Sequence, residues 1–168
     1  MATSGMDAGP TQNSHGIATH SYEETIELGR KISAKLSPPV LVLLTGDLGS
    51  GKTTLTKGII SGLGAAREED VTSPTFTLVH VFQQAGKADS SDSPQSVKVY
   101  HADLYRVENF HDLESLGLED ALAEKAIVII EWSERFTFRS PWPRVEIHLE
   151  HLGGDARQIE ISGLSLER

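Results

Sequence analysis

One stretch of the chain constrains its fold more than any other: a run of apolar residues that leads straight into a glycine-rich loop and a helical pattern. The apolar run covers residues 40–44, the loop 46–51 and the helical pattern 52–63. A continuous apolar run is typical of a strand covered on both faces of its sheet. A helix that begins after a glycine-rich turn presents free backbone N–H groups, where an anion can bind. The stretch therefore predicts an α/β sheet with an anion site at the end of a buried strand.

The loop matches the phosphate-loop pattern G-x-x-x-x-G-K-[ST], with G-D-L-G-S-G-K-T at residues 46–53. Glycines let the backbone turn sharply, so that successive N–H groups point at one anion. Lys52 is predicted to place its ammonium on the β and γ phosphates, and the Thr53 hydroxyl to complete a Mg²⁺ shell. A glycine-rich turn without a ligand is the plainer alternative. The residues expected to bind the nucleotide are Gly46, Asp47, Leu48, Gly49, Ser50, Gly51, Lys52, Thr53 and Thr54.

A second acidic group for the metal is expected at the end of another buried strand. Residues 127–130 are apolar and lead into Glu131, which is the arrangement of a Walker B segment. The strand end would deliver this carboxylate beside the phosphate loop, where Glu131 would bind Mg²⁺ directly or through water. Acidic residues at the ends of buried strands are common in proteins, so this prediction depends on the phosphate loop.

Two further segments carry groups that could aim a water molecule at a γ phosphate. T-S-P-T-F at residues 72–76 combines hydroxyls with a proline, and is expected to form a switch segment through Ser73, Pro74 and Thr75. H-A-D-L-Y-R at residues 101–106 carries Asp103, which could orient or deprotonate the water. A hydroxyl-rich turn and an ordinary ion pair between Asp103 and Arg106 are the alternatives. Lys52, Asp103 and Glu131 are thus the predicted catalytic residues.

Helical and strand patterns alternate along the rest of the chain. Ser21 and Glu24 have the spacing of a capping box, at the start of a helix that ends before two prolines at 38–39. A helix over 110–124 is expected to break near Gly117, and residues 83–96 are expected to form a mobile hairpin loop. Strands are predicted over residues 75–82, 97–101, 126–130, 145–149 and 158–161. The expected fold is α/β and P-loop NTPase-like, with a mixed, mostly parallel sheet flanked by helices and a C-terminal antiparallel hairpin.

Length and composition narrow the possible functions. With 168 residues, the chain is expected to form one P-loop ATPase domain over residues 17–168, after a disordered tail over 1–16. The absence of cysteine excludes disulfides, thiolate zinc sites and cysteine nucleophiles. Acidic residues outnumber basic ones 24 to 15, a net charge of -9, which argues against an extended basic surface for nucleic acid. The histidines, His101 among them, lack zinc-ligand spacing and are expected to be solvated or structural. Without a signal sequence or membrane span, a cytoplasmic protein is expected.

Taken together, four motifs resemble those of one protein family. G-D-L-G-S-G-K-T-T at 46–54, T-S-P-T-F at 72–76, H-A-D-L-Y-R at 101–106 and E-W at 131–132 occur in the order found in the TsaE family. TsaE proteins are the small ATPases of bacterial tRNA threonylcarbamoyladenosine synthesis, and the resemblance covers residues 19–161. It implies an ATP- and Mg²⁺-dependent subunit that acts with TsaB and TsaD when adenosine 37 is modified in tRNAs that read ANN codons. It also implies a functional role for Asp103, and places Tyr22 near the adenine.

Other functional classes remain open at this point. A small-molecule kinase could use the same loop, although the chain lacks the arginine-rich lid of such enzymes. A GTPase is disfavoured because no N-K-x-D sequence occurs. A nucleotide-dependent assembly subunit would bind ATP but barely hydrolyse it. Hydrolysis by the chain alone is expected to be slow, since no arginine is obviously placed to stabilise the transferring phosphoryl group. The acidic charge predicts that tRNA is held mainly by partner proteins, and no membrane association is expected.

Overall fold

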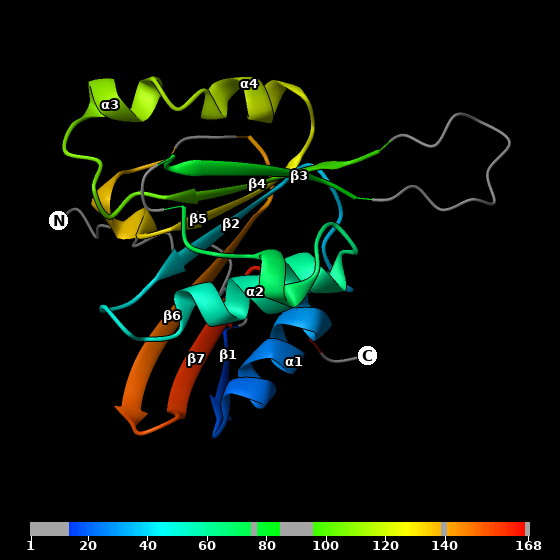
Figure 1. Ribbon diagram of the computed structural model, residues 1–168, viewed down its shortest axis with the longest axis vertical. Coiled ribbons are helices and arrows are strands. Elements are labelled where there is room, and N and C mark those ends of the chain that lie inside the picture. The colour runs from blue at the N-terminus through cyan, green and yellow to red at the C-terminus, as the bar shows by residue number, and fades with distance from the viewer. Residues whose placement is uncertain (1–13, 75–76, 85–95, 139–140, 167–168) are drawn as a thin grey trace, which may run out of the picture.

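The computed structural model describes residues 14–74, 77–84, 96–138 and 141–166, and has a seven-stranded sheet at its centre (Figure 1). The strands are ordered β1-β7-β6-β2-β5-β4-β3 across the sheet. In chain order they are β1 His15–Thr19, β2 Val40–Thr45, β3 Val79–Gln83, β4 Lys98–Asp103, β5 Ile127–Glu131, β6 Arg144–Gly153 and β7 Ala156–Ser162. The middle strands β6, β2, β5 and β4 run parallel, while β3, β7 and β1 are antiparallel to their neighbours. The expected mixed sheet with a C-terminal hairpin is confirmed.

Helices cover both faces of this sheet. α1 Tyr22–Ser33 and α2 Lys52–Gly62 lie on one face, and α3 Phe110–Glu114 and α4 Leu118–Ala123 lie on the other (Figure 1). Two 3-10 turns, Glu68–Asp70 and Ser133–Arg135, complete the described helical elements. Alternate residues of β2 point to opposite faces, so Val42 packs in the layer under α1 and α2 while Leu43 packs under α3 and α4. No helix in the described residues is long and apolar enough to cross a membrane.

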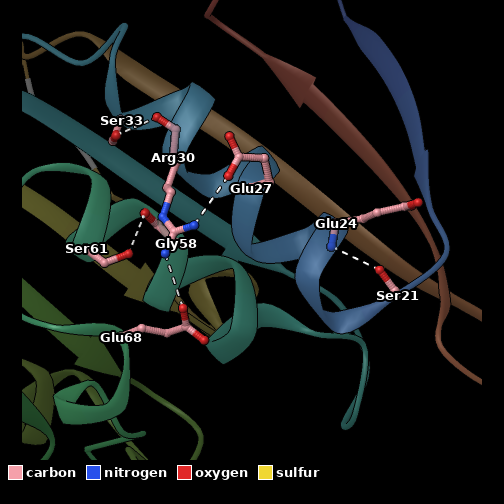
Figure 2. A network of polar contacts seen from close by, with 8 residues as sticks. All are labelled: Ser21, Glu24, Glu27, Arg30, Ser33, Gly58, Ser61 and Glu68. Carbon is pink, nitrogen blue, oxygen red and sulfur yellow. Dashed lines mark hydrogen bonds and ion pairs between the residues drawn. The ribbon is translucent and has the colours of Figure 1, made fainter.

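Polar contacts organise α1 and its junction with the segment after α2 (Figure 2). Ser21 caps α1, because its Oγ accepts a hydrogen bond from the backbone N–H of Glu24 at 3.1 Å. This confirms the predicted capping spacing. On the opposite end of α1, Arg30 pairs with Glu27 at 3.3 Å and with Glu68 at 3.3 Å. The second pair links α1 to the 3-10 turn that follows α2.

The two helices on this face approach each other through glycines. A Cβ on Gly58 of α2 would lie 2.2 Å from the carbonyl oxygen of Ile26 on α1. A Cβ on Gly29 of α1 would lie 2.5 Å from the carbonyl oxygen of Leu55 on α2. Neither position has room for a larger residue, so the close contact holds α2 and the loop before it at a fixed place over the sheet.

The first strand begins earlier than the sequence predicted. Residues 1–16 were expected to form a disordered tail, but β1 begins at His15 and pairs with β7, with Ile17 opposite Ile159. His15 and Gly16 therefore belong to the sheet. The reason is the exposed edge of β7, which β1 covers while Ile17 packs against the core. Residues 1–13 of the expected tail lie outside the described residues.

Some element boundaries also shift. The first helix ends at Ser33, and the strand expected from residue 75 begins at Val79. Residues 75–76 lie outside the described residues, and Leu78 before the strand has a left-handed φ of 64°. Most of the loop expected over 83–96 also lies outside them, and Gln83 itself ends β3. The helix over 110–124 breaks as predicted, because Gly117 between α3 and α4 has a φ of 71°.

Candidate functional site

The glycine-rich loop connects the end of β2 to the start of α2. Gly46, Gly49 and Gly51 have φ angles of 143°, 78° and 103°. Residues with a side chain rarely adopt such angles, and a Cβ on Gly46 would lie 2.4 Å from the carbonyl oxygen of Leu149. Gly51 is also the N-cap of α2, so no side-chain oxygen at the cap accepts hydrogen bonds from the first turn. The loop therefore has the backbone form that a phosphate-binding loop requires.

Lys52, the first residue of α2, folds back onto the loop. Its Nζ donates hydrogen bonds to the carbonyl oxygens of Gly46 and Asp47 at 2.7 and 2.9 Å. A third bond reaches Ser50 Oγ at 3.3 Å. Burial lowers the pKa of Lys52 from its ordinary value, while the negative charge of Glu131 acts in the opposite direction. The loop thus holds the ammonium at its centre.

Trp132 covers the same ammonium from the other side. Lys52 Nζ lies 3.9 Å from the centroid of the indole ring, a distance typical of a cation–π contact. The ring of Tyr105 lies beside Trp132, with 4.9 Å between the two centroids. Trp132 has a left-handed backbone, with φ 60° and ψ 36°, which is strained for a bulky residue. This turn directs the chain away from β5 immediately after Glu131.

Glu131 reaches the loop from the end of β5. Its Oε1 accepts a hydrogen bond from Thr53 Oγ1 at 2.8 Å. Its Oε2 bonds to Nε2 of His101 on β4. Because β5 lies between β2 and β4 in the covered centre of the sheet, the residue Glu131 is only 1 % exposed. The structure thus brings the predicted metal-binding pair into contact. His101 is fully buried, so of its two expected roles the solvated one is wrong.

Asp103 ends β4 next to Glu131, its partner in the strand register. Its Oδ2 accepts a hydrogen bond from Ser73 Oγ at 2.6 Å, and its Oδ1 accepts one from the backbone N–H of Tyr105 at 2.9 Å. The segment at 72–76 and the motif at 101–106 therefore meet, as their proposed roles require. Pro74 accepts a backbone hydrogen bond from Leu78 at 2.9 Å, whereas Thr75 lies outside the described residues.

These groups surround one cleft of about 470 Å³. The predicted site residues that line it are Leu48, Gly49, Gly51, Lys52, Thr53, Thr54, Ser73, Asp103 and Glu131. Gly46, Asp47 and Ser50 do not line the cleft but contact Lys52 instead. Arg106 and Arg157 also line it, so cationic groups face the cleft beside its two carboxylates.

A small hollow of about 70 Å³ adjoins this cleft. Gly51, Thr54 and Arg157 line both spaces. The hollow is completed by Ser21, Tyr22, Thr25 and Asp155. Contact between Tyr22 and an adenine stays a prediction, and this hollow is where the contact would occur.

Another hollow, of about 420 Å³, opens on the other side of the sheet near β6 and β7. Thr45, Arg144 and His148 help to line it, and Thr45 Oγ1 lies 2.8 Å from His148 Nδ1. It contains neither the glycine-rich loop nor any predicted site residue. The chemistry therefore places the candidate site in the cleft above the loop.

The residues of the cleft fit a magnesium–nucleotide complex. A threonine hydroxyl and a carboxylate, the kind of oxygen ligands that Mg²⁺ takes, meet in Thr53 and Glu131. Within the described part of the chain, no group of three or more His, Cys, Asp or Glu residues could hold a metal alone. Magnesium commonly binds through one or two protein oxygens together with substrate phosphates. The fit therefore requires phosphates, which the loop and Lys52 are shaped to receive.

Sequence reasoning missed two residues of this region. Arg157 comes from β7, and its N–H groups donate to the carbonyl oxygens of Gly154 and Ala156 at 2.8 and 3.0 Å. Arg157 lies near the loop because the β6–β7 hairpin lies beside β2. No local sequence pattern reveals that placement. The contact of His101 with Glu131 depends on β4 lying beside β5. No local pattern in the motif at 101–106 indicates which strand lies beside it.

Comparisons with known proteins show which family this chain resembles along most of its length. The family model described as "Threonylcarbamoyl adenosine biosynthesis protein TsaE" matches residues 19–159. The tRNA threonylcarbamoyladenosine biosynthesis protein TsaE of Haemophilus influenzae is 38% identical over 122 residues, which are 73% of this chain and 69% of the relative. The protein of the same description from Bacillus subtilis is 32% identical over 146 residues, 87% of this chain and 84% of the relative.

A solved structure extends the comparison to three dimensions. The crystal structure of YdiB from Bacillus subtilis superposes with a TM-score of 0.63 and 27% sequence identity, covering 94% of this chain and 90% of YdiB. The P-loop fold around the cleft is therefore shared with a known protein over nearly the whole chain. Since the family model and these relatives all match along most of its length, the chain belongs to the TsaE family of threonylcarbamoyladenosine biosynthesis proteins.

Proposed function

We propose that the chain binds ATP with Mg²⁺ and hydrolyses the ATP in support of tRNA threonylcarbamoyladenosine synthesis. One observation carries the proposal: a single cleft gathers Lys52, Thr53, Glu131 and Asp103. These side chains supply a cation for phosphates, oxygen ligands for a metal and a carboxylate for the attacking water. The membership of the chain in the TsaE family supports the biological process.

Binding would begin at the loop. The backbone N–H groups of residues 46–51 and the N-terminus of α2 would take the β and γ phosphates, and Lys52 would exchange its loop carbonyl partners for phosphate oxygens. Thr53 and Glu131 would hold the metal, and bound Mg²⁺ would supply charge neutralisation on those phosphate oxygens. The nucleoside would then lie toward the small hollow lined by Thr54 and Tyr22, next to the Tyr22 side chain.

Hydrolysis would use Asp103 as the group that orients the water. A carboxylate has about four acceptor positions, and Ser73 and Tyr105 occupy two of those on Asp103. A water held there would attack the γ phosphorus while its proton passes to an Asp103 oxygen. The new oxygen–phosphorus bond forms as the bond to the β–γ bridging oxygen breaks, and ADP leaves with that electron pair. Asp103 then returns the proton to the inorganic phosphate.

We further propose that TsaB and TsaD are the partners that make this hydrolysis efficient. Lys52 has three hydrogen bonds within its own loop, so this cation must change partners before it can stabilise the transferring group, while Arg157 is held through Nη1 to the turn between β6 and β7. Docking of a partner protein at the open cleft could drive that change or add another cation. The isolated chain is therefore expected to bind ATP well and to hydrolyse it slowly.

Steady-state ATP hydrolysis with and without TsaB and TsaD tests this proposal. We expect a low rate for the chain alone and a rate at least about 10-fold higher with both partners, since one added cation can contribute far more than that. ATP binding without hydrolysis in either state would favour the nucleotide-dependent assembly subunit. Transfer of phosphate to a small molecule would favour the kinase.

Contact with tRNA is proposed to be indirect. The net charge of -9 leaves the chain without the cationic excess that neutralises nucleic-acid phosphates. We expect no tRNA binding by the isolated chain in a filter-binding titration at low salt, where electrostatic binding is strongest. Binding that weakens steeply as salt is added would contradict this proposal and would place tRNA on the chain itself.

A further inference from the structure

His101 lies behind the proposed metal ligand and cannot reach the cleft. It is part of β4, its side chain is fully buried, and it does not line the cleft. Its Nε2 bonds to Glu131 Oε2, whereas Glu131 Oε1 accepts from Thr53. Because a carboxylate only accepts hydrogen bonds, Nε2 is the nitrogen that carries the hydrogen. The two oxygens of Glu131 are therefore held separately, one toward the interior and one toward Thr53.

The other nitrogen of His101 shows why packing alone does not explain this residue. Nδ1 is buried and has no hydrogen-bond partner among the described residues. A buried acceptor without a partner costs about 1–3 kcal/mol. An apolar side chain such as leucine would pack at this position of β4 without that cost. What the imidazole adds at this position is the N–H group directed at Glu131.

Glu131 has a particular need for such a donor. The Glu131 side chain is 2 % exposed, so its carboxylate loses most of its hydration and requires hydrogen bonds in place of water. Without His101, Oε2 of Glu131 would lose the hydrogen bond from Nε2. The carboxylate could then rotate and turn Oε2 toward the cleft. The bond to His101 fixes the rotation of the carboxylate, so that Oε1 stays next to Thr53 Oγ1.

We propose that His101 is a positioning residue that orients Glu131 for Mg²⁺ in the nucleotide complex. The inference rests on the proposed binding of Mg²⁺ and ATP, and adds a residue that touches neither. Hydrogen-bond partners of metal ligands typically change metal affinity by about 10- to 100-fold when they are removed. The role of His101 is therefore to raise the affinity of the nucleotide-bound site for Mg²⁺, with little effect on nucleotide binding in the absence of the metal.

The test measures binding of a fluorescent ATP analogue by the full chain, with Mg²⁺ titrated from an EDTA-treated start. The midpoint is the Mg²⁺ concentration that gives half of the metal-dependent gain in nucleotide affinity. We expect His101→Leu to raise this midpoint by about 10-fold or more. His101→Gln should keep that concentration near the original, because a glutamine amide reaches the position of Nε2. His101→Asn should behave like leucine, because its amide reaches only the position of Nδ1.

Two controls keep the result specific. His80 is the strand partner of His101 on β3, and its ring lies edge-on to that of His101 with 6.4 Å between the centroids, so His80→Leu makes the matched change beside His101 while the donor to Glu131 stays. The Mg²⁺ titration is compared within each variant, so a smaller folded fraction does not alter its midpoint. An unchanged midpoint in His101→Leu, or a midpoint raised equally in His101→Gln, would overturn the role of His101 and leave the proposed function intact. Failure of the unaltered chain to bind the nucleotide would overturn the proposed function as well.

Discussion

Replacement of Lys52 by alanine is expected to abolish ATP-dependent support of threonylcarbamoyladenosine formation and to weaken ATP binding by about 10- to 100-fold. Each hydrogen bond between charged groups contributes about 1.5–3 kcal/mol, and Lys52 is the cation at the centre of the loop. Loss of charge stabilisation during phosphoryl transfer would lower the hydrolysis rate by about a further 100-fold or more. Nucleotide titration and a modification assay with TsaB, TsaD and tRNA measure the two effects.

A matched control separates the role of this ammonium from a general loss of charge. Lys57 is on the same helix and does not line the cleft or the adjoining hollow, so Lys57→Ala removes the same charge elsewhere. Lys52→Ala also removes three contacts within the loop, and thermal unfolding of both variants shows whether the fold persists. Tight ATP binding and full modification with the alanine variant at position 52 would rule out the proposed site.

The phosphate loop could be predicted because its determinants are consecutive. Gly46, Gly51 and Lys52 have to lie within a few residues of one another to form one loop at a helix start, and the apolar run before them indicates a covered strand. Glu131 and Asp103 could be predicted for a related reason. Each ends a strand, and the carboxyl ends of neighbouring parallel strands meet at one edge of a sheet.

Contacts that depend on strand order could not be predicted in the same way. His101 meets Glu131 because β4 lies beside β5, and Arg157 meets the loop because the β6–β7 hairpin lies beside β2. Both adjacencies join segments far apart in the chain, and the alternation of a strand carries no information on its neighbour. The strand at His15–Thr19 was missed because it is short and gains its stability from the edge of β7 rather than from a pattern of its own.

The proposed phosphate-binding groups and the proposed water-activating carboxylate lie on different elements of the cleft. Lys52 and Thr53 belong to the loop and helix that would hold the phosphates, whereas Asp103 belongs to β4 and contacts Ser73 of the segment at 72–76. Replacing Asp103 by asparagine should therefore leave ATP affinity within about threefold, while the partner-stimulated hydrolysis rate falls by about 100- to 10,000-fold because the proton acceptor is lost. Asparagine can keep both existing contacts, since its oxygen accepts from Tyr105 and its amide donates to Ser73.

Single-turnover hydrolysis of bound ATP, in the presence of TsaB and TsaD, isolates the chemical step from binding and from product release. Asp120→Asn is a suitable control, because this residue is exposed on α4 and makes the same change in charge outside the cleft. Unimpaired hydrolysis by Asp103→Asn would contradict its role as proton acceptor. A loss confined to hydrolysis, set beside the loss of affinity in Lys52→Ala, would assign the two ends of the cleft to different steps: the loop to holding ATP and the end of β4 to activating the water.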